Sequence, residues 1–196
     1  PDILHYTLTD FVTSCGVRIP ALRVYYQVFG KALGTAPVVV VNHAFTGNSQ
    51  VTGENGWWKE AIGEGKLIDT LKYTVVAFNI PGNGFGAREE DMIPNYEHWA
   101  GIDIARIFNK GLTEHLGLKE VFALVGCSLG GGIAWEMAAL APTLFKELII
   151  VAADWKATDW IIGNCLLQEQ ILKNSTHPLH DARLHAMLCY RTPQSL

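Results

Sequence analysis

Charged residues are scarce in this 196-residue chain, and it contains no basic run. Lys, Arg, Asp and Glu make up 17% of the sequence, and the formal net charge is −4. Such a chain lacks the electrostatic footprint of a nucleic-acid-binding protein. Hydrophobic residues make up 49% of the sequence, which indicates an ordered, core-rich globule. At this length the core fits one domain.

The sequence also lacks an apolar stretch long enough to cross a bilayer. Its first residues do not form a basic-then-apolar signal peptide. No C-x-x-C pair occurs, because the four cysteines are far apart: Cys15, Cys127, Cys165 and Cys189. Isolated cysteines are typical of free thiols in a reducing compartment. We therefore expect a cytoplasmic protein that binds small molecules and neither nucleic acid nor membranes.

Apolar runs rich in β-branched residues alternate with helical patterns along most of the chain. An opening hairpin is predicted at residues 4–12 and 19–29. Buried strands are predicted at residues 38–41, 74–79, 121–125 and 148–152. Helices are predicted at residues 57–62, 102–116 and 131–141. This alternation predicts an α/β protein with a doubly wound, mostly parallel sheet.

The pattern changes near residue 155, after which helices are expected but no further strand. We therefore divide the chain into an α/β core at residues 1–154 and a helical segment at residues 155–196. The helical segment contains three histidines and a cysteine of the types that bind metal ions: His177, His180, His185 and Cys189. However, Pro178 interrupts the group, and its angular spread at helical pitch is too wide for one ligand face. No metal is predicted.

The most informative motif is Gly126-Cys127-Ser128-Leu129-Gly130, which lies between an apolar run and a small-residue helix pattern. A G-x-S-x-G sequence between a strand and a helix is typical of a nucleophile elbow. Its two glycines remove Cβ atoms that would collide with the strand and the helix. We predict that Ser128 is a catalytic nucleophile. The alternative interpretation is a glycine-rich turn with an incidental serine.

Acyl transfer through a serine requires hydrogen-bond donors that stabilise an oxyanion. One predicted donor is the backbone N–H of Leu129, the residue after the nucleophile. The second is the N–H of Phe45, in the loop of residues 42–47 that follows a predicted strand. His43 in this loop is interpreted as a structural histidine, with a general base as the alternative.

No residue of the chain is assigned as the base or as its acidic partner. In this architecture an Asp or Glu and then a His follow the nucleophile along the chain. Asp154 ends a predicted strand and is a candidate for the acid. The later histidines fall in the helical segment, where we interpret them as surface residues: His177, His180 and His185.

A second glycine motif, residues 82–87, formally matches the dinucleotide fingerprint G-x-G-x-x-A. That fingerprint requires a helix that opens at the glycines. Here a polar run follows instead, at residues 88–91. We therefore favour a glycine loop beside the site, and we predict no permanently bound cofactor.

Several motifs together make the chain resemble the homoserine O-acetyltransferases, acyltransferases of the α/β-hydrolase fold. The matching stretches are residues 43–47, 56–58, 63–70, 126–131, 182–183 and 190–191. The resemblance implies an α/β-hydrolase fold in which residues 155–196 begin a helical lid. Members of the family are longer and carry the Asp and His of the triad in their C-terminal part. The resemblance therefore implies that this chain is C-terminally incomplete.

The implied reaction has two steps, with acetyl-CoA as co-substrate. Ser128 would take the acetyl group, and the hydroxyl of homoserine or a similar amino acid would accept it. Arg183 and Tyr190 match acceptor-binding positions of the family, and a guanidinium grips a carboxylate through two hydrogen bonds. The family's dimers also imply a homodimer through the lid helices. Residues 82–88 depart from the family's Gly-Ser-Thr-Gly-Pro segment, which bears on acceptor choice.

Two alternatives to an acetyltransferase stay open at this stage. The same serine machinery would make an esterase of small esters if water reached the acyl group. A catalytically silent domain that associates with a partner is the other alternative, because the chain offers no base for Ser128.

Overall fold

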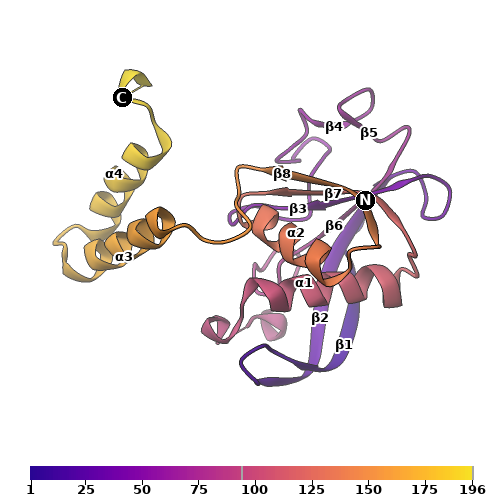
Figure 1. The fold of residues 1–196 in the computed structure, drawn as a ribbon, viewed down its shortest axis with the longest axis horizontal. Helices are drawn as coiled ribbons and strands as arrows, with labels where there is room; N and C mark the ends of the chain where they lie inside the picture. The colour runs from indigo at the N-terminus through magenta and orange to yellow at the C-terminus, as the bar shows by residue number, and fades with distance from the viewer. Residues whose placement is uncertain (94, 196) are drawn as a thin grey trace. The chain divides into compact units, whose positions relative to one another are not determined.

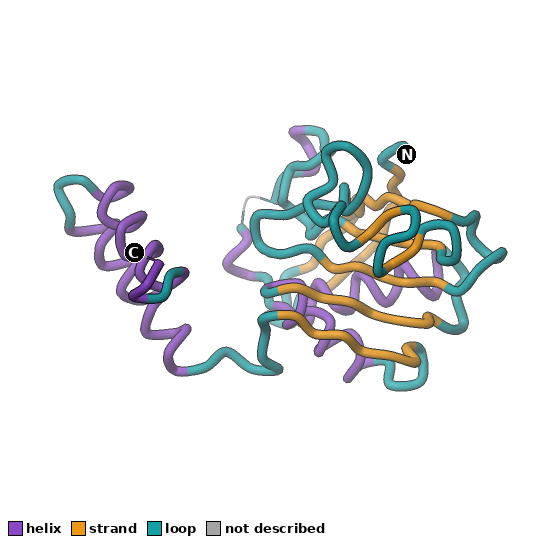
Figure 2. The backbone as a smooth tube through the Cα atoms, turned by 90° about the horizontal axis from the view of Figure 1, so that it is seen from above, coloured by secondary structure: helices purple, strands orange, loops and turns teal. Residues whose placement is uncertain are grey.

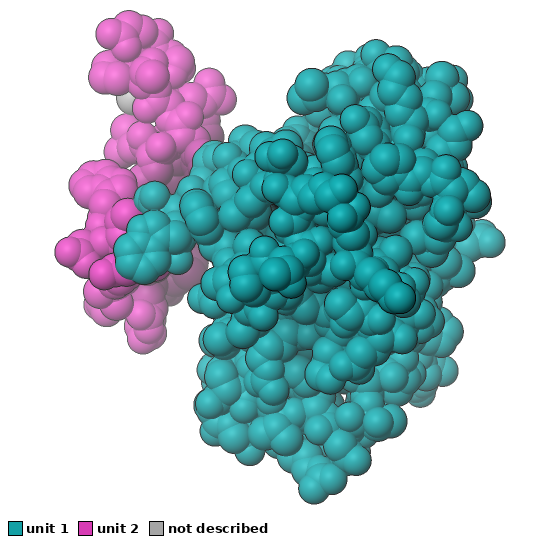
Figure 3. All heavy atoms as spheres, turned by 45° about the vertical axis from the view of Figure 1, so that its right-hand side comes forward, with its two compact units in different colours: residues 1–155 teal, residues 156–196 magenta. Residues whose placement is uncertain are grey.

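The computed structural model describes residues 1–93 and 95–195. The chain forms two compact units, Pro1–Trp155 and Lys156–Leu196, which we describe one at a time (Figure 3). Among the described residues, the first unit holds a six-stranded sheet, a two-stranded sheet and two α-helices, whereas the second holds a helical hairpin. Within the described part of the chain, no helix meets the length and hydropathy needed to cross a bilayer.

Six strands form the main sheet, in the order β1-β2-β6-β3-β7-β8 (Figures 1 and 2). β6, β3, β7 and β8 pair in parallel, and the β1–β2 hairpin adds to β6 in antiparallel fashion. The prediction of a doubly wound, mostly parallel sheet is thereby confirmed. The strands are β1 (Leu4–Val12), β2 (Arg18–Gly30), β3 (Val38–Asn42), β6 (Thr74–Phe78), β7 (Val121–Cys127) and β8 (Phe145–Val151).

The valines of β3 divide between two cores because successive side chains of a strand point to opposite faces of the sheet. Val38 and Val40 pack on the face covered by helices α1 and α2, which Figure 1 shows lying together. Val39 and Val41 pack on the other face, against residues such as Val51 from the segment between β3 and β6. Burial on both faces explains the uninterrupted apolar run of this strand.

Both helices of the first unit were predicted from the sequence. α1 (Gly101–Lys110) continues into one π-helical turn at Gly111–His115. Gly117 then ends the helical run with a φ of 66°, a left-handed conformation that suits glycine. α2 (Leu129–Leu140) begins directly after Ser128 and follows β7 through a sharp turn. That junction places the serine at the carboxyl ends of the parallel strands.

The predicted helix at residues 57–62 is wrong. These residues form turns that lead into two short parallel strands, β4 (Ile62–Gly63) and β5 (Ile68–Asp69). A Cβ at Gly56 would lie 2.4 Å from the backbone of Thr52, so the chain folds back tightly on itself here. The Trp57 indole donates to the carbonyl of Asn48 at 2.8 Å. These contacts override the local helical pattern.

The second unit consists of α3 (Asp159–Asn174) and α4 (Pro178–Tyr190), which confirms that helices follow residue 155. The Thr158 hydroxyl caps α3 by accepting the Ile161 N–H at 3.3 Å. Gln168 joins the two helices by donating to the carbonyl of Ala182 at 3.0 Å.

Candidate active site

The turn between β7 and α2 is the predicted elbow. Ser128 has a φ of 53° and a ψ of −120°, a conformation rarely adopted by residues other than glycine. Its amide donates to the carbonyl of Val151 at 2.9 Å. Its carbonyl accepts from Gly131 and Gly132 at 2.9 and 3.1 Å. The strained turn is therefore held from both sides, and the Ser128 side chain is exposed.

The glycines of the elbow are required by close backbone contacts. A Cβ at Gly126 would lie 2.3 Å from the carbonyl oxygen of Gly130. A Cβ at Gly130 would lie 2.4 Å from the His43 carbonyl oxygen and 2.5 Å from that of Asn42. The Asn42 side chain also donates to the Gly130 carbonyl at 3.3 Å. The first turn of α2 thus packs directly on the end of β3, where the predicted oxyanion loop begins.

We expect Ser128→Gly to raise the free energy of unfolding by about 1 kcal/mol, because glycine adopts a positive φ without steric cost. Ser128→Ala keeps the Cβ and is the matched control, for which no such gain is expected. Urea unfolding of the two variants and the native chain measures the difference. Equal stability of the glycine and alanine variants would show that position 128 is not strained.

Phe45 and Leu129, the two predicted oxyanion donors, lie on segments that meet at Gly130. Phe45 occupies the turn after β3, where the Gly47 amide donates to the Ala44 carbonyl at 2.9 Å. Leu129 is the first residue of α2, so its amide belongs to the group that has no acceptor within its own helix. Phe45 is 80% exposed, so its side chain does not anchor it in the core, and the backbone of the turn determines where its N–H lies. The donor roles of both amides stay predictions.

His43 is a buried histidine whose ring is bonded on both nitrogens. Nδ1–H donates to the Ala44 carbonyl at 2.7 Å, and Nε2 accepts the Ile80 N–H at 3.1 Å. These partners determine the tautomer, because a carbonyl can only accept and an amide N–H can only donate. Burial lowers the pKa of His43, which keeps the ring neutral. His43 therefore has the structural role favoured from the sequence, with no free nitrogen to act as a base.

Acidification is expected to destabilise the first unit through His43. The pKa of His43 is about 6.5 in the unfolded chain and is lowered in the fold, so the unfolded chain binds the proton first. The contribution of neutral His43 to the free energy of unfolding is therefore fully present above about pH 6.5 and is lost as the pH falls toward the folded-state pKa. The total loss is about 1.4 kcal/mol for each pH unit by which folding lowers the pKa. Urea unfolding at about pH 7.5 and 5.5 measures this loss. The result would be contradicted by an equal pH dependence in His43→Gln.

Arg183 and Tyr190, the predicted acceptor contacts, lie on α4 in the second unit. They are seven residues apart, two helical turns, and both side chains are exposed. His185 of the same helix is paired with the Gln168 side chain at 2.7 Å. His180 is paired with Asp181 at 3.0 Å. The roles of Arg183 and Tyr190 stay predictions, and no base is assigned to Ser128.

The glycine loop of residues 82–87 does not open a helix. Its glycines have φ values of 89°, 78° and 68°, and a single 3₁₀ turn at Glu89–Asp91 follows. This geometry contradicts a dinucleotide site, which needs a helix N-terminus at the glycines. Asn79, three residues before the first glycine of the loop, is buried and donates to the Phe85 carbonyl at 3.1 Å. Sequence reasoning missed Asn79, because one asparagine after a strand is an ordinary feature.

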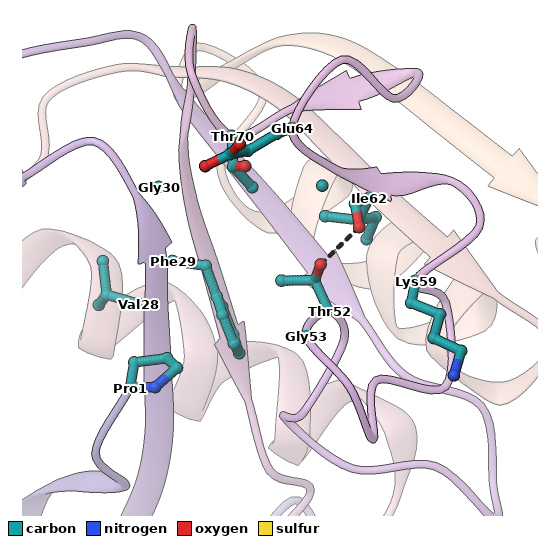
Figure 4. Close-up of a pocket in the computed structure, with 11 residues that line it drawn as sticks. Pro1, Val28, Phe29, Gly30, Thr52, Gly53, Lys59, Ile62, Glu64 and Thr70 are labelled. Atoms are coloured by element: carbon teal, nitrogen blue, oxygen red, sulfur yellow. Dashed lines mark hydrogen bonds between the residues drawn. The ribbon is translucent and has the colours of Figure 1, made fainter.

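A cavity of about 550 Å³, shown in Figure 4, is lined by residues of β2 and of the segment between β3 and β6. Phe29 and Gly30 of β2 line it, and Gly30 pairs with Thr74, the first residue of β6. The cavity is thus near the amino end of β6, whereas Ser128 follows the carboxyl end of β7. In its wall the Thr52 hydroxyl donates to the Ile62 carbonyl at 2.5 Å, as Figure 4 shows. This cavity is not part of the candidate active site.

Comparison with known proteins agrees with this architecture. The homoserine O-acetyltransferase of Corynebacterium diphtheriae is 31% identical over 168 residues, which cover 82% of this chain and 45% of that protein. The enzyme of the same name from Cyclobacterium marinum is 33% identical over 201 residues, covering 92% and 56%. The crystal structure of homoserine o-acetyltransferase from Staphylococcus aureus superposes with a TM-score of 0.82 at 28% identity, covering 99% of this chain and 60% of that one.

The chain therefore spans about half the length of the curated relatives that it matches. A family model described as alpha/beta hydrolase fold matches residues 37–169, which include the turn after β3, the elbow and the start of α3. With its parallel sheet, its strained serine turn and this match over more than half of its length, the chain belongs to the alpha/beta hydrolase fold family.

Proposed function

We propose that this chain carries the acyl-accepting serine of an O-acetyltransferase that acts on homoserine or a similar amino-acid alcohol. The observation that carries the proposal is the exposed Ser128 in a strained elbow, packed through Gly130 against the turn of Phe45. A serine so placed projects from the sheet, and the positive end of the α2 dipole lies beside it. The choice of an acetyl group and of homoserine as acceptor follows the name of the relatives, homoserine O-acetyltransferase.

In the first step, the Ser128 oxygen attacks the acetyl carbonyl of acetyl-CoA. The carbon–sulfur bond breaks, the thiol of coenzyme A leaves with a proton, and acetyl-Ser128 is formed. In the second step, the acceptor hydroxyl attacks this ester, and Ser128 regains its proton. The N–H groups of Phe45 and Leu129 stabilise the oxyanion in both steps, and loss of one such donor costs roughly 10²–10³-fold in kcat.

The acceptor is proposed to bind through α4. Arg183 grips the α-carboxylate through two parallel hydrogen bonds, and the Tyr190 hydroxyl supplies a further polar contact. We place the general base and its acidic partner in the part of the relatives' length that this chain does not span. We also propose that the protein is cytoplasmic, takes part in amino-acid biosynthesis and dimerises through α3 and α4.

The test is to incubate the product of the complete gene with acetyl-CoA and to measure its intact mass. We expect one added acetyl group, which peptide mapping locates on Ser128, and O-acetylhomoserine after homoserine is added. Formation of acetate alone would replace the transferase with an esterase. Absence of acetyl on the protein would overturn the proposal. Acetylation of the complete product but not of residues 1–196 would place the base outside this chain.

A further inference from the structure

Two consecutive residues after β6 hold the two ends of the turn at residues 43–49. At one end, the Ile80 N–H donates to His43 Nε2 at 3.1 Å. At the other end, the Ser49 N–H donates to Asn79 Oδ1 at 2.7 Å. His43, Ser49 and Asn79 are each at most 3% exposed, so both bonds are shielded from water. The turn that carries Phe45 is therefore clamped by the two residues that follow the neighbouring strand β6.

A buried polar network extends this clamp on both sides. The Ser49 hydroxyl donates to Gln27 Oε1 at 2.7 Å, which ties the turn to β2. Asn79 Nδ2 donates to the Phe85 carbonyl at 3.1 Å, which ties the glycine loop to the same side chain. The side-chain polar atoms of Gln27, Ser49 and Asn79 all have partners. A fully satisfied buried network is rigid, and breaking one of its bonds leaves an unpaired polar group.

We infer that Asn79 is a positioning residue that holds the turn of residues 43–49, and with it the Phe45 N–H, in place for the reaction at Ser128. The significance of Phe45 rests on the proposed function, whereas the clamp itself does not. An oxyanion donor is effective when its backbone is rigid before the reaction begins. The exposed Phe45 side chain gives the turn no anchor in the core, so the hydrogen bonds at its ends supply the rigidity.

The glycine loop shares this anchor. Asn79 binds the turn through its oxygen and the loop through its nitrogen, and the same oxygen also accepts from Asn83 of the loop at 3.3 Å. Asn83 Nδ2 lies 3.4 Å from His43 Nε2 as well, so Asn79 and Asn83 together couple the loop to the turn.

The first test is amide hydrogen exchange of Asn79→Ala, measured without any substrate. We expect the amides of residues 44–49 to exchange at least about 10-fold faster, while those of β3 and β7 are unchanged. Asn109→Ala is the matched control, because it also removes an asparagine-to-carbonyl bond, from Asn109 to Met137 at 3.0 Å. This control is expected to leave residues 44–49 as in the native chain. Unchanged exchange of these residues in Asn79→Ala would overturn the inference.

The second variant, Asn79→Asp, separates the bonds that the side-chain oxygen accepts from the bond that the nitrogen donates. Its carboxylate still accepts the Ser49 N–H but cannot donate to the Phe85 carbonyl. We expect residues 44–49 to stay protected and residues 82–87 to exchange faster. If Asn79→Ala does not fold, Asn79→Asp still tests whether Asn79 holds the turn and the loop. Loss of protection in the turn but not in the loop would contradict the inference.

A kinetic measurement links the clamp to the reaction. In the complete gene product, Asn79→Ala is expected to lower the rate of Ser128 acetylation at saturating acetyl-CoA by about 10-fold or more, with KM little changed, because the donor acts in the transition state. An unchanged rate would remove the catalytic part of the inference. If the native protein were not acetylated at all, the proposed function would fail, while the exchange data would still decide on the clamp.

Discussion

Replacing Ser128 by alanine is expected to abolish the proposed acetyl transfer while leaving the fold intact. Removal of a serine nucleophile costs roughly 10⁶-fold in kcat, because no other group can form the covalent intermediate. The side chain is exposed and caps no helix amide, so its hydroxyl contributes little to stability. The alanine also keeps the Cβ and hence the strained turn. The measurement is the rate of O-acetylhomoserine formation, together with the intact mass after incubation with acetyl-CoA.

Ser195→Ala is a suitable control for Ser128→Ala, because Ser195 is an exposed serine that bonds only to Thr192 among the described residues. It is expected to retain the native rate. Acetyl bound to the Ser128→Ala protein would show that another residue is the nucleophile. A circular dichroism spectrum equal to that of the native protein would show that the lost activity does not come from unfolding.

Gly130→Ala is expected to lower the free energy of unfolding by about 3 kcal/mol, at the upper end of the usual cost of overpacking. The added Cβ would lie 2.4 and 2.5 Å from the carbonyl oxygens of His43 and Asn42. Both are backbone atoms of a buried strand end, so neither can move as a flexible side chain would. The elbow would have to separate from the turn of Phe45, and acetyl transfer is expected to fall with stability.

Gly132→Ala is the matched control, two residues further along the same helix. A Cβ at this position meets no atom within 4 Å. Alanine favours a helix over glycine by up to about 1 kcal/mol, so this variant is expected to be more stable than the native chain. Urea unfolding thus gives changes of opposite sign for the same substitution. A gain in stability from Gly130→Ala would show that the close approach of α2 to β3 is not required.

The strands and the elbow could be predicted from the sequence because their determinants are local. Val38 to Val41 form a β-branched run that suits a strand buried on both faces, and they divide between two cores as such a strand must. The glycines around Ser128 are spaced as the strand–turn–helix geometry demands. Contacts with residues 50–51 decided residues 57–62, where the Trp57 and Trp58 amides bond to the carbonyls of Gln50 and Val51, and turns form in place of the expected helix.

Local sequence patterns specify the parallel α/β core, the serine turn between strand and helix, and the change to helices near residue 155. Each of these features follows from the periodicity of apolar residues or from the backbone freedom of glycine. Both are local properties that can be read from residues close together in the sequence. The surroundings of the serine turn, in contrast, depend on how distant segments pack together. The tertiary structure brings Gly130 against the end of β3, occupies both nitrogens of His43, and joins Gln27, Ser49 and Asn79 in one buried network. Apart from the bond of His43 to the adjacent Ala44 carbonyl, those contacts connect segments far apart in sequence, and no local pattern encodes such a pairing of polar groups.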